Sequence, residues 1–228
     1  MKLLALDTAT EACSAALLID GEVRERFEIA PRDHARLLLP MAQSLLDEAG
    51  LKVGGLDAIA FGRGPGSFTG VRIAASITQG VAFAASLPVI PVSSLAALAQ
   101  GLLPHAEAGE RLLAAIDARM DEVYWGAFTL GAEGLVVPSG EERVVPPDAV
   151  PLPDGDGWFG VGTGWGSYGV QLAARLGDRV RGSESDHFPR AAAVARLAVA
   201  DWQAGRTVAP EFAIPVYLRD QVAKKAGG

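Results

Sequence analysis

The chain has 228 residues, of which 50% are hydrophobic and 21% charged, and its formal net charge is -7 at pH 7. This composition excludes a chain that is disordered by default, and the acidic balance argues against a protein that grips a phosphate backbone alone. The single cysteine, Cys13, excludes an intrachain disulfide, and the apolar runs are too short to cross a bilayer. No secretory signal pattern opens the sequence, so we expect a cytoplasmic protein.

The N-terminal half alternates between strand patterns and helix patterns. Strands are expected at 2–6, 14–19, 23–29, 57–61 and 89–92, with an Asp20-Gly21 turn between the second and the third. Helices are expected at 33–49, with a kink at Pro40 and a stop at Gly50, at 69–86, and from the capping residue Ser93 to about 103. This alternation predicts an α/β fold in which helices cover a sheet.

The second half repeats features of the first. A strand ending at Asp117 and a second strand at 123–128 parallel the strand ending at Asp7 and its successor. The glycines of 61–68 recur with the same spacing in 161–168, and each segment ends in a serine followed by an aromatic residue. These matches favour a duplicated fold over a chance recurrence of glycines.

We therefore expect an N-terminal lobe at 1–102 and a C-terminal lobe at 103–206. Residues 138–157 are rich in Pro, Gly and Asp, which predicts a long surface connection, and a last helix is expected at 189–204. The segment 207–228 is expected to pack back on the first lobe, with a frayed end at 224–228.

The loop that contains Gly62, Gly64 and Gly66 is the clearest local signal for ligand binding. Glycines let backbone N–H groups approach an anion at the start of the following helix. The spacing matches neither the Walker A pattern nor the dinucleotide-binding pattern. A tight turn with close packing explains the same glycines equally well, so both interpretations remain open.

Asp7 and Asp117 are the candidate carboxylates. Asp7 ends a central strand and is followed by Thr8 and Thr10, at the edge where α/β folds place their sites. Alternatively these three side chains satisfy local backbone groups. Asp117 would face Asp7 across a cleft, but two carboxylates alone do not define a mechanism.

Two helix patterns are rich in residues that could contact another helix. The pattern at 69–86 is dominated by small side chains, and the pattern at 33–49 precedes it with larger apolar ones. A partner-binding face and a purely internal core explain this composition equally well. The residues concerned are Leu38, Met41, Leu45, Val71, Ala75, Thr78 and Ala82.

Four segments carry a resemblance that spans nearly the whole chain. They are Leu4-Ala5-Leu6-Asp7-Thr8-Ala9-Thr10-Glu11, Phe61-Gly62-Arg63-Gly64-Pro65-Gly66-Ser67-Phe68-Thr69-Gly70-Val71-Arg72, Ala115-Ile116-Asp117-Ala118-Arg119-Met120 and Pro215-Val216-Tyr217-Leu218-Arg219. Together they resemble the bacterial TsaB (YeaZ) family. The resemblance implies an actin-like ATPase superfamily (ASKHA, RNase H-like) fold of two duplicated lobes, each with a mixed sheet flanked by helices.

The same resemblance implies a role in making threonylcarbamoyladenosine in tRNA. The implied role is that of a noncatalytic scaffold or activating subunit of TsaD, the paralogous transferase that modifies the adenosine next to the anticodon in tRNAs reading codons that begin with A. The ATPase TsaE is the implied third member, and tRNA would be contacted only through the complex. The helices at about 33–49 and 69–86 would pair with TsaD, or form a homodimer in isolation.

One departure from the transferase paralogue can be located. Ser94 and Leu98 stand about where TsaD-like proteins carry the two ligands of an H-x-x-x-H metal helix. A leucine cannot bind a metal and a lone serine hydroxyl is a poor ligand, so we expect no metal there. We accordingly expect neither autonomous transferase activity nor the protease activity suggested by older glycoprotease-like descriptions.

Two other interpretations compete with the scaffold. One is a small ASKHA-type phosphotransferase or ATPase that uses Asp7 and Asp117, with both glycine loops holding phosphates. The other is a remnant nucleotide site without turnover, formed by Asp7, Thr8, Thr10, Gly62, Gly64 and Gly66. We expect no tightly bound cofactor, with ATP or ADP at a subunit junction as the open alternative.

Overall fold

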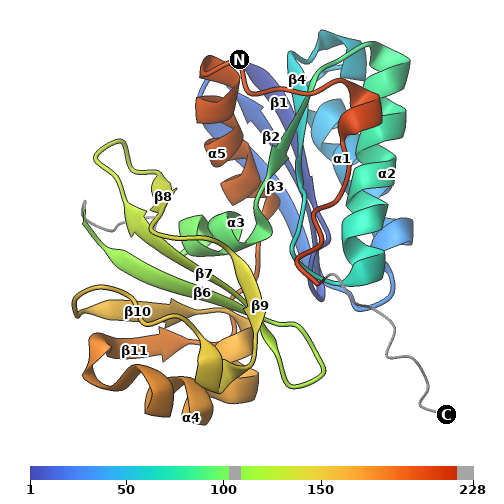
Figure 1. Ribbon diagram of the computed structural model, residues 1–228. Helices are drawn as coiled ribbons and strands as arrows, with labels where there is room; N and C mark the ends of the chain where they lie inside the picture. The colour runs from blue at the N-terminus through green and yellow to red at the C-terminus, as the bar shows by residue number, and fades with distance from the viewer. Residues whose placement is uncertain (103–108, 220–228) are drawn as a thin grey trace, which may run out of the picture.

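Two sheets of related order form the framework of the protein (Figure 1). A computed structural model describes residues 1–102 and 109–219. The first sheet has the order β3-β2-β1-β4-β5. Its strands are β1 (Lys2–Asp7), β2 (Ala12–Ile19), β3 (Glu22–Ile29), β4 (Ala58–Gly62) and β5 (Val89–Val92).

The second sheet repeats this order as β8-β7-β6-β10-β11, with β9 also paired to β7. In each sheet the first strand pairs antiparallel with the second and parallel with a later strand, β4 or β10. The predicted duplication is therefore confirmed, and Asp7 and Asp117 end equivalent strands. The strands are β6 (Arg111–Asp117), β7 (Val123–Leu130), β8 (Val136–Pro138), β9 (Arg143–Val145), β10 (Trp158–Val161) and β11 (Val180–Glu184).

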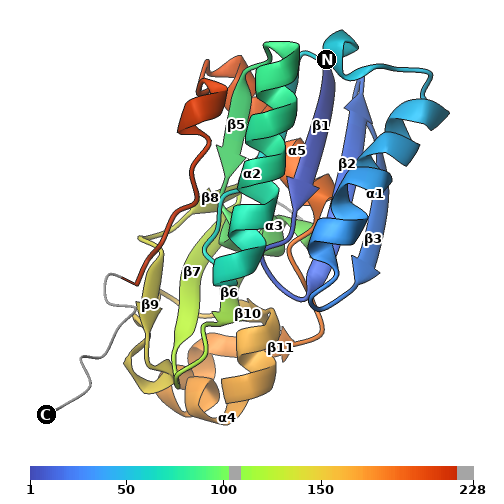
Figure 2. The same cartoon turned by 90° about the vertical axis from the view of Figure 1, so that its right-hand side faces the viewer.

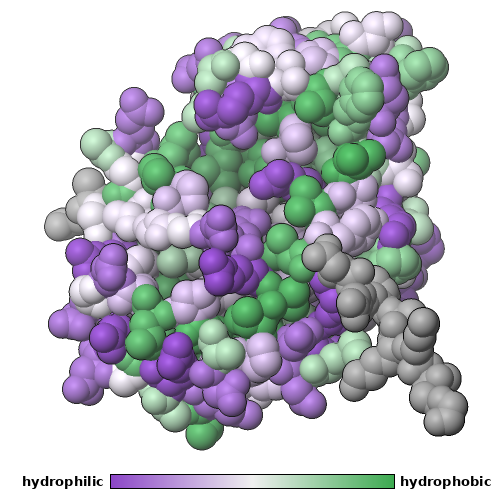
Figure 3. Space-filling view, in the orientation of Figure 1, coloured by the Kyte–Doolittle hydropathy of each residue, from purple (hydrophilic) through white to green (hydrophobic). Residues whose placement is uncertain are grey.

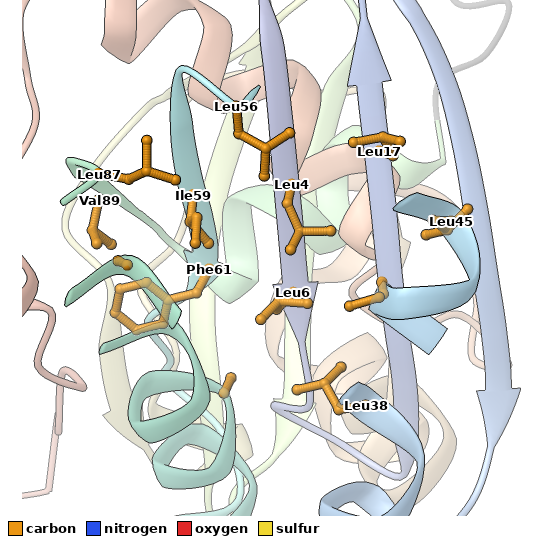
Figure 4. Packing of buried hydrophobic residues seen from close by; sticks show 14 of the residues in the cluster. Leu4, Leu6, Leu17, Leu38, Leu45, Leu56, Ile59, Phe61, Leu87 and Val89 are labelled. Carbon is orange, nitrogen blue, oxygen red and sulfur yellow. The ribbon is translucent and has the colours of Figure 1, made fainter. Parts of the chain in front are cut away.

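Helices cover both faces of the first sheet. Alternate residues of its strands point to opposite sides, and Leu4 and Leu6 pack with Leu38 and Leu45 of α1 (His34–Glu48) in one cluster, shown in Figure 4. Helix α2 (Phe68–Ala85) belongs to the same layer. The opposite face packs on α5 (Ala191–Gln203).

The layers continue through the second lobe. Helix α3 (Ser94–Gly101) contributes to the clusters on both sheets, so it lies between them. Helix α4 (Thr163–Leu176) covers the far face of the second sheet. The short 3₁₀ turns are η1 (Val53–Gly55), η2 (Pro147–Ala149), η3 (Gly177–Arg179) and η4 (Pro210–Phe212).

The lobe boundary differs from the expected one at α5. The sequence-based division at 206 placed this helix with the second sheet, whereas its buried alanines pack on strands of the first. Small side chains allow this helix to approach the sheet closely. Val208 bridges Val89 and Val216 bonds Arg63 in the first lobe, whereas Arg219 contacts the second lobe. Helix α3 ends at Gly101, two residues before the expected end. Residues 103–108 and 220–228 lie outside the described residues, so the division at 102 and the frayed tail stay predictions.

Two local predictions differ from the structure. Helix α1 continues through the exposed Pro40, and the kink expected there stays a prediction. The segment 138–157 contains β9 and η2 and so is not purely a surface connection. Helix α4 begins at Thr163, which places Gly164 and Gly166 inside a helix and not in a loop.

Candidate functional site

A cleft of about 450 Å³ lies between the lobes, where β1 and β6 end. The turns after these two strands form its walls together with the N-terminal ends of α1 and α2. Of the residues predicted for a nucleotide site, Thr10, Gly66 and Asp117 line this cleft. Asp7, Thr8, Gly62 and Gly64 are not among its lining residues.

Asp7 is sealed inside the first lobe. Its side chain is fully buried, and its Oδ1 accepts the backbone N–H of Ala9 at 3.0 Å. Its Oδ2 has no hydrogen-bond partner and lies against Gly62, where an added Cβ would come within 1.8 Å of it. Burial raises the pKa of Asp7 to about 7. A carboxyl group in this position cannot reach a ligand in the cleft without rearrangement.

The two threonine hydroxyls form hydrogen bonds with backbone groups of the protein. The Thr8 hydroxyl donates to the carbonyl of Gly70 at 2.7 Å, and the Thr10 hydroxyl accepts the N–H of Ala12 at 3.3 Å. Both side chains are buried. The alternative of local hydrogen bonding therefore explains Thr10, whereas Thr8 bonds the start of α2, far along the chain.

The first glycine loop packs closely against neighbouring segments of the chain and forms hydrogen bonds with them. The N–H groups of Arg63, Gly64 and Ser67 donate to Val92, Ser94 and Ala9 respectively. A Cβ on Gly66 would lie 2.3 Å from the carbonyl oxygen of Ala9. These three N–H groups are engaged within the protein and are not available to a phosphate, so phosphate binding by this loop stays a prediction.

The second glycine segment does not form a matching loop. Gly162 precedes α4 with a positive φ of 105°, and its N–H donates to Glu184. Gly164 and Gly166 then lie within the helix. The two glycine segments therefore differ in conformation, because α4 starts several residues earlier in its segment than α2 does in the first. Phosphate binding by the second segment stays a prediction.

Asp117 has the opposite environment to Asp7. Its Oδ2 accepts the Ser167 hydroxyl at 3.0 Å and pairs with Arg119 at 3.2 Å. The Arg119 guanidinium also reaches across the cleft to Glu11 in the first lobe, at 3.0 Å. A charged network therefore links the two lobes at the cleft.

Sequence reasoning did not select the cations that line this cleft. They are Arg32, Arg119 and Arg219, and the imidazole of His34 lines the cleft beside them. His34 begins α1 and is buried, and its Nε2 has no hydrogen-bond partner. The motifs containing Arg119 and Arg219 were noted, but only the fold brings these distant segments together.

The predicted partner-binding residues of α1 and α2 do not lie on the outer surface. Leu38, Leu45, Val71, Ala75, Thr78 and Ala82 are all buried beneath the helices, and Met41 alone of the seven is half-buried. The helical phase was therefore assigned wrongly for six positions. These side chains hold the helices on their own sheet and cannot contact a partner.

The outer side of the two helices presents a different set of residues, which we call the pairing face. Figure 2 shows α1 and α2 next to each other on the side that faces the viewer. Arg72 is the one charged residue within the eighteen of α2, and Phe83 is 75% exposed. The pairing face comprises Leu37, Met41, Ile73, Ser76, Ile77, Gly80, Phe83 and Ala84.

Ser94 and Leu98 lie in the interior between the sheets. Both are fully buried, and the Ser94 hydroxyl accepts the N–H of Gly64 at 3.2 Å. Leu98 packs in the cluster on the second sheet. Within residues 1–102 and 109–219, no group of three or more His, Cys, Asp or Glu side chains is arranged to hold a metal ion. The helices of this part of the chain include none that is long and apolar enough to cross a membrane.

A second hollow of about 510 Å³ separates β8 from α5 and β5. Figure 3 shows apolar surface in the hollow between the two lobes. Arg63 lines it, and its Nε has no hydrogen-bond partner. Nearby, Glu142 hydrogen-bonds the hydroxyl of Ser93, and burial raises the pKa of this carboxyl group. No sequence pattern indicated this hollow.

The duplicated sheets and the cleft between them define a two-lobe actin-like protein. Residues 27–155 match the family described as TsaD, tRNA N6-adenosine threonylcarbamoyltransferase. The chain is 44% identical to the Escherichia coli K12 tRNA threonylcarbamoyladenosine biosynthesis protein TsaB, over 99% of this chain and 97% of that protein. The corresponding Haemophilus influenzae protein is 42% identical, over 99% and 96%.

Two solved structures are similar over almost their entire length. YeaZ from Pseudomonas aeruginosa is 50% identical with a TM-score of 0.87, covering 95% of this chain and 99% of that one. A second Pseudomonas aeruginosa structure, described as an uncharacterized protein with similarity to peptidase YeaZ, is 50% identical with a TM-score of 0.88, covering 96% and 99%. The chain belongs to the TsaB (YeaZ) family, which confirms the resemblance and the expected fold.

Proposed function

We propose that this protein is a noncatalytic scaffold subunit in the biosynthesis of tRNA threonylcarbamoyladenosine. It pairs with a TsaD-like paralogue, the transferase that modifies the adenosine next to the anticodon in tRNAs reading codons that begin with A. The similarity to proteins named for this pathway supports the proposal. It acts in the cytoplasm and contacts tRNA only through the complex.

The observation that carries this proposal is the pairing face. Two long neighbouring helices leave apolar and small residues exposed, and α2 has a single charge. Gly80 lies in the middle of α2, where glycine is less favourable than alanine by about 1 kcal/mol. A Cβ at Gly80 would meet open space, so packing within the chain does not require this glycine. Close approach by a helix of another subunit accounts for it.

A matched pair of substitutions tests the pairing face. Gly80→Arg places a charge on the face without disturbing the core. Gly169→Arg does the same at a half-buried glycine of α4, where an added Cβ would also meet open space. Co-purification with the TsaD-like paralogue and modification of tRNA by the reconstituted system are measured for both. We expect Gly80→Arg to abolish pairing and Gly169→Arg to preserve it. If a folded Gly80→Arg protein pairs normally, the pairing face is wrongly assigned.

The same face serves for a homodimer in isolation. Paralogous lobes present related surfaces, so a second copy can occupy the place of the paralogue. Gly80→Arg is therefore expected to convert a homodimer to a monomer in sedimentation measurements. The TsaD-like subunit is expected to compete with the homodimer.

The cleft supports a secondary role at a subunit junction. Its lining cations, Arg32, Arg119 and Arg219, face the ends of α1 and α2, where ATP or ADP could be held once a partner closes the site. A TsaE-like ATPase is the proposed third member. Nucleotide titration of the isolated protein and of the reconstituted pair tests this, with binding expected only in the pair.

The competing proposal is a small phosphotransferase or ATPase that uses Asp7 and Asp117. The burial of Asp7 and the internal hydrogen bonds of the first glycine loop disfavour it. An ATP hydrolysis assay on the isolated protein separates the two. Steady turnover that disappears in Asp7→Ala would overturn the noncatalytic proposal.

A further inference from the structure

A segment near the C-terminus, residues 213–219, runs between the two lobes, and we call it the strap. Figures 1 and 2 show it descending in red from η4 towards the second lobe. Ala213 is buried in the first lobe, and its carbonyl accepts the side-chain amide of Gln79 in α2 at 3.2 Å. The N–H of Val216 donates to the carbonyl of Arg63 at 2.8 Å. The upper part of the strap is thus fixed to the first lobe.

The middle of the strap contacts the N-terminal end of α2. The rings of Tyr217 and Phe68 lie 6.1 Å apart, and the Arg72 guanidinium lies 3.2 Å from the Phe68 ring centre and 4.8 Å from that of Tyr217. Phe68 is 57% exposed and Tyr217 45%. This cluster lies on the helix that carries the pairing face, at a place where a docked protein can reach it.

The end of the strap holds the turn after β6 in the second lobe. Arg219 donates to the carbonyls of Ala118 and Arg119 at 3.3 and 3.4 Å, and it pairs with Glu122. Its other amino group lies 3.4 Å from the sulfur of Met120. One guanidinium therefore fixes the whole turn.

This turn has an unusual backbone. Arg119, Met120 and Asp121 are consecutive non-glycine residues with positive φ angles of 61°, 56° and 59°. L-residues rarely adopt this left-handed conformation, so the turn requires support from its surroundings. The same turn carries Arg119, which pairs with Glu11 across the cleft.

We infer that the strap links the pairing helix α2 to the interlobe cleft, so that a protein docked over Phe68 and Tyr217 changes the conformation of the turn at 118–122. The element that changes in this inference is the left-handed turn, which Arg219 holds in the conformation described above. Moving Tyr217 moves Arg219, two residues further on, and releases or tightens the turn that positions Arg119. The use of this link in an assembly rests on the proposed function, whereas the mechanical link does not.

The first test uses the protein alone, labelled at its methionine methyl groups. The sequence contains Met1, Met41 and Met120, so Met120 reports on the turn while Met1 and Met41 report on folding elsewhere. Arg219→Lys keeps the charge but loses the planar fork that spans several acceptors. We expect it to shift the Met120 signal and to accelerate hydrogen exchange of the Glu122 amide about tenfold, as expected for loss of a charge-assisted hydrogen bond.

The decisive variant is Tyr217→Ala, with Phe212→Ala as its control. Phe212 is also exposed and precedes the strap, but it lies in η4, away from the turn. Tyr217→Ala is expected to shift Met120 and to accelerate exchange at the turn severalfold, with Met1 and Met41 unchanged, while Phe212→Ala does neither. If Arg219→Lys changes the turn but Tyr217→Ala does not, Arg219 stabilises the turn independently of Tyr217. That result overturns the inference.

A second experiment adds the unlabelled TsaD-like paralogue. A shift of Met41 reports docking on the pairing face, and a Met120 shift that occurs in the wild type but is lost in Tyr217→Ala supports the link. An equal Met120 shift in both proteins means direct coverage by the partner, which overturns the link. If Met41 does not respond, the proposed function fails, and the variants of the isolated protein still decide on the strap.

Discussion

Asp7 and Asp117 end the equivalent strands β1 and β6, in sheets of the same strand order. Asp7 is fully buried against Gly62 with one oxygen unpaired, whereas Asp117 lines the cleft and is bound by Ser167 and Arg119. The duplication therefore preserved the position of the carboxylate but not its access to the cleft. A pair of symmetric catalytic carboxylates cannot be assumed from the repeat.

The outer helices of the two lobes also differ, although the lobes are related by duplication. In the first lobe the pairing face is apolar and α2 has one charged residue, while the helix α4 of the second lobe is interrupted at Tyr168, which has non-helical backbone angles. The glycines also differ, since those of the first lobe precede α2 and two of their counterparts lie inside α4. The first lobe thus has the surface suited to docking, and the second supplies most of the charged turn at the cleft.

The largest effect is expected at the glycines that the two lobes share. Gly66→Ala places a Cβ 2.3 Å from the carbonyl oxygen of Ala9, which is already held by the N–H of Ser67. Because the clashing oxygen belongs to the backbone and cannot move aside as a flexible side chain would, we expect a loss of about 3 kcal/mol in the free energy of unfolding. Urea denaturation followed by circular dichroism measures this loss.

The matched control is Gly166→Ala in α4. The nearest atom to its new Cβ is the Ser185 Cβ at 3.2 Å, and alanine is the better helix former by up to about 1 kcal/mol. We expect a stability within about 1 kcal/mol of the wild type. Equal losses in the two variants would show that the two glycine segments have the same packing role.

The next effect concerns the buried carboxyl group of Asp7. Its pKa is about 7 in the folded protein, compared with an ordinary value of 3.8, because burial disfavours the charged form. Between these two values the folded state binds more protons than the unfolded state, so this group makes stability fall as the pH rises from about 4 to about 7. Above pH 7 the full free-energy cost of burying the charged Asp7 carboxylate remains.

Asp7→Asn removes this penalty and keeps an oxygen to accept the N–H of Ala9. At pH 8 we expect the variant to be more stable than the wild type by about 2 kcal/mol, with the difference disappearing towards pH 4. Unfolding curves at several pH values provide the check. A variant that is less stable at every pH would mean that the Asp7 carboxylate is stabilised by an interaction other than those described.

The arrangement of strands and helices followed from the sequence because it depends on periodicity. The strand before Asp7 recurs before Asp117 with similar neighbours, and the resulting sheets have the same order. The position of α5 did not follow, since a helix rich in alanine can pack on either sheet. Only the contacts with the first sheet decide its place.

The site was harder to predict because it depends on which side of a helix faces inward. The residues of α2 itself are mostly small and apolar on every side of the helix. Ala75 and Gly80 therefore look alike in the sequence, although Ala75 is buried and Gly80 is exposed. The sealing of Asp7 depends on the close approach of Gly62 from another strand. Likewise, Arg219 meets a turn about one hundred residues earlier in the chain, a contact that no local pattern encodes.

The smallest expected effect is at the ion pair between the lobes. Glu11 and Arg119 are 3.0 Å apart with side chains 40% and 73% exposed, so solvent screens most of their attraction. We expect Glu11→Gln to cost less than about 1 kcal/mol at low salt and nothing measurable at 1 M salt. Glu141→Gln, which removes an exposed pair with Arg143 within the second lobe, is the control. If Glu11→Gln costs several kcal/mol more than Glu141→Gln, cleft charges hold the lobes together; if the two are alike, the buried layer of α3 between the sheets does so, and the cleft is free to change when a partner docks.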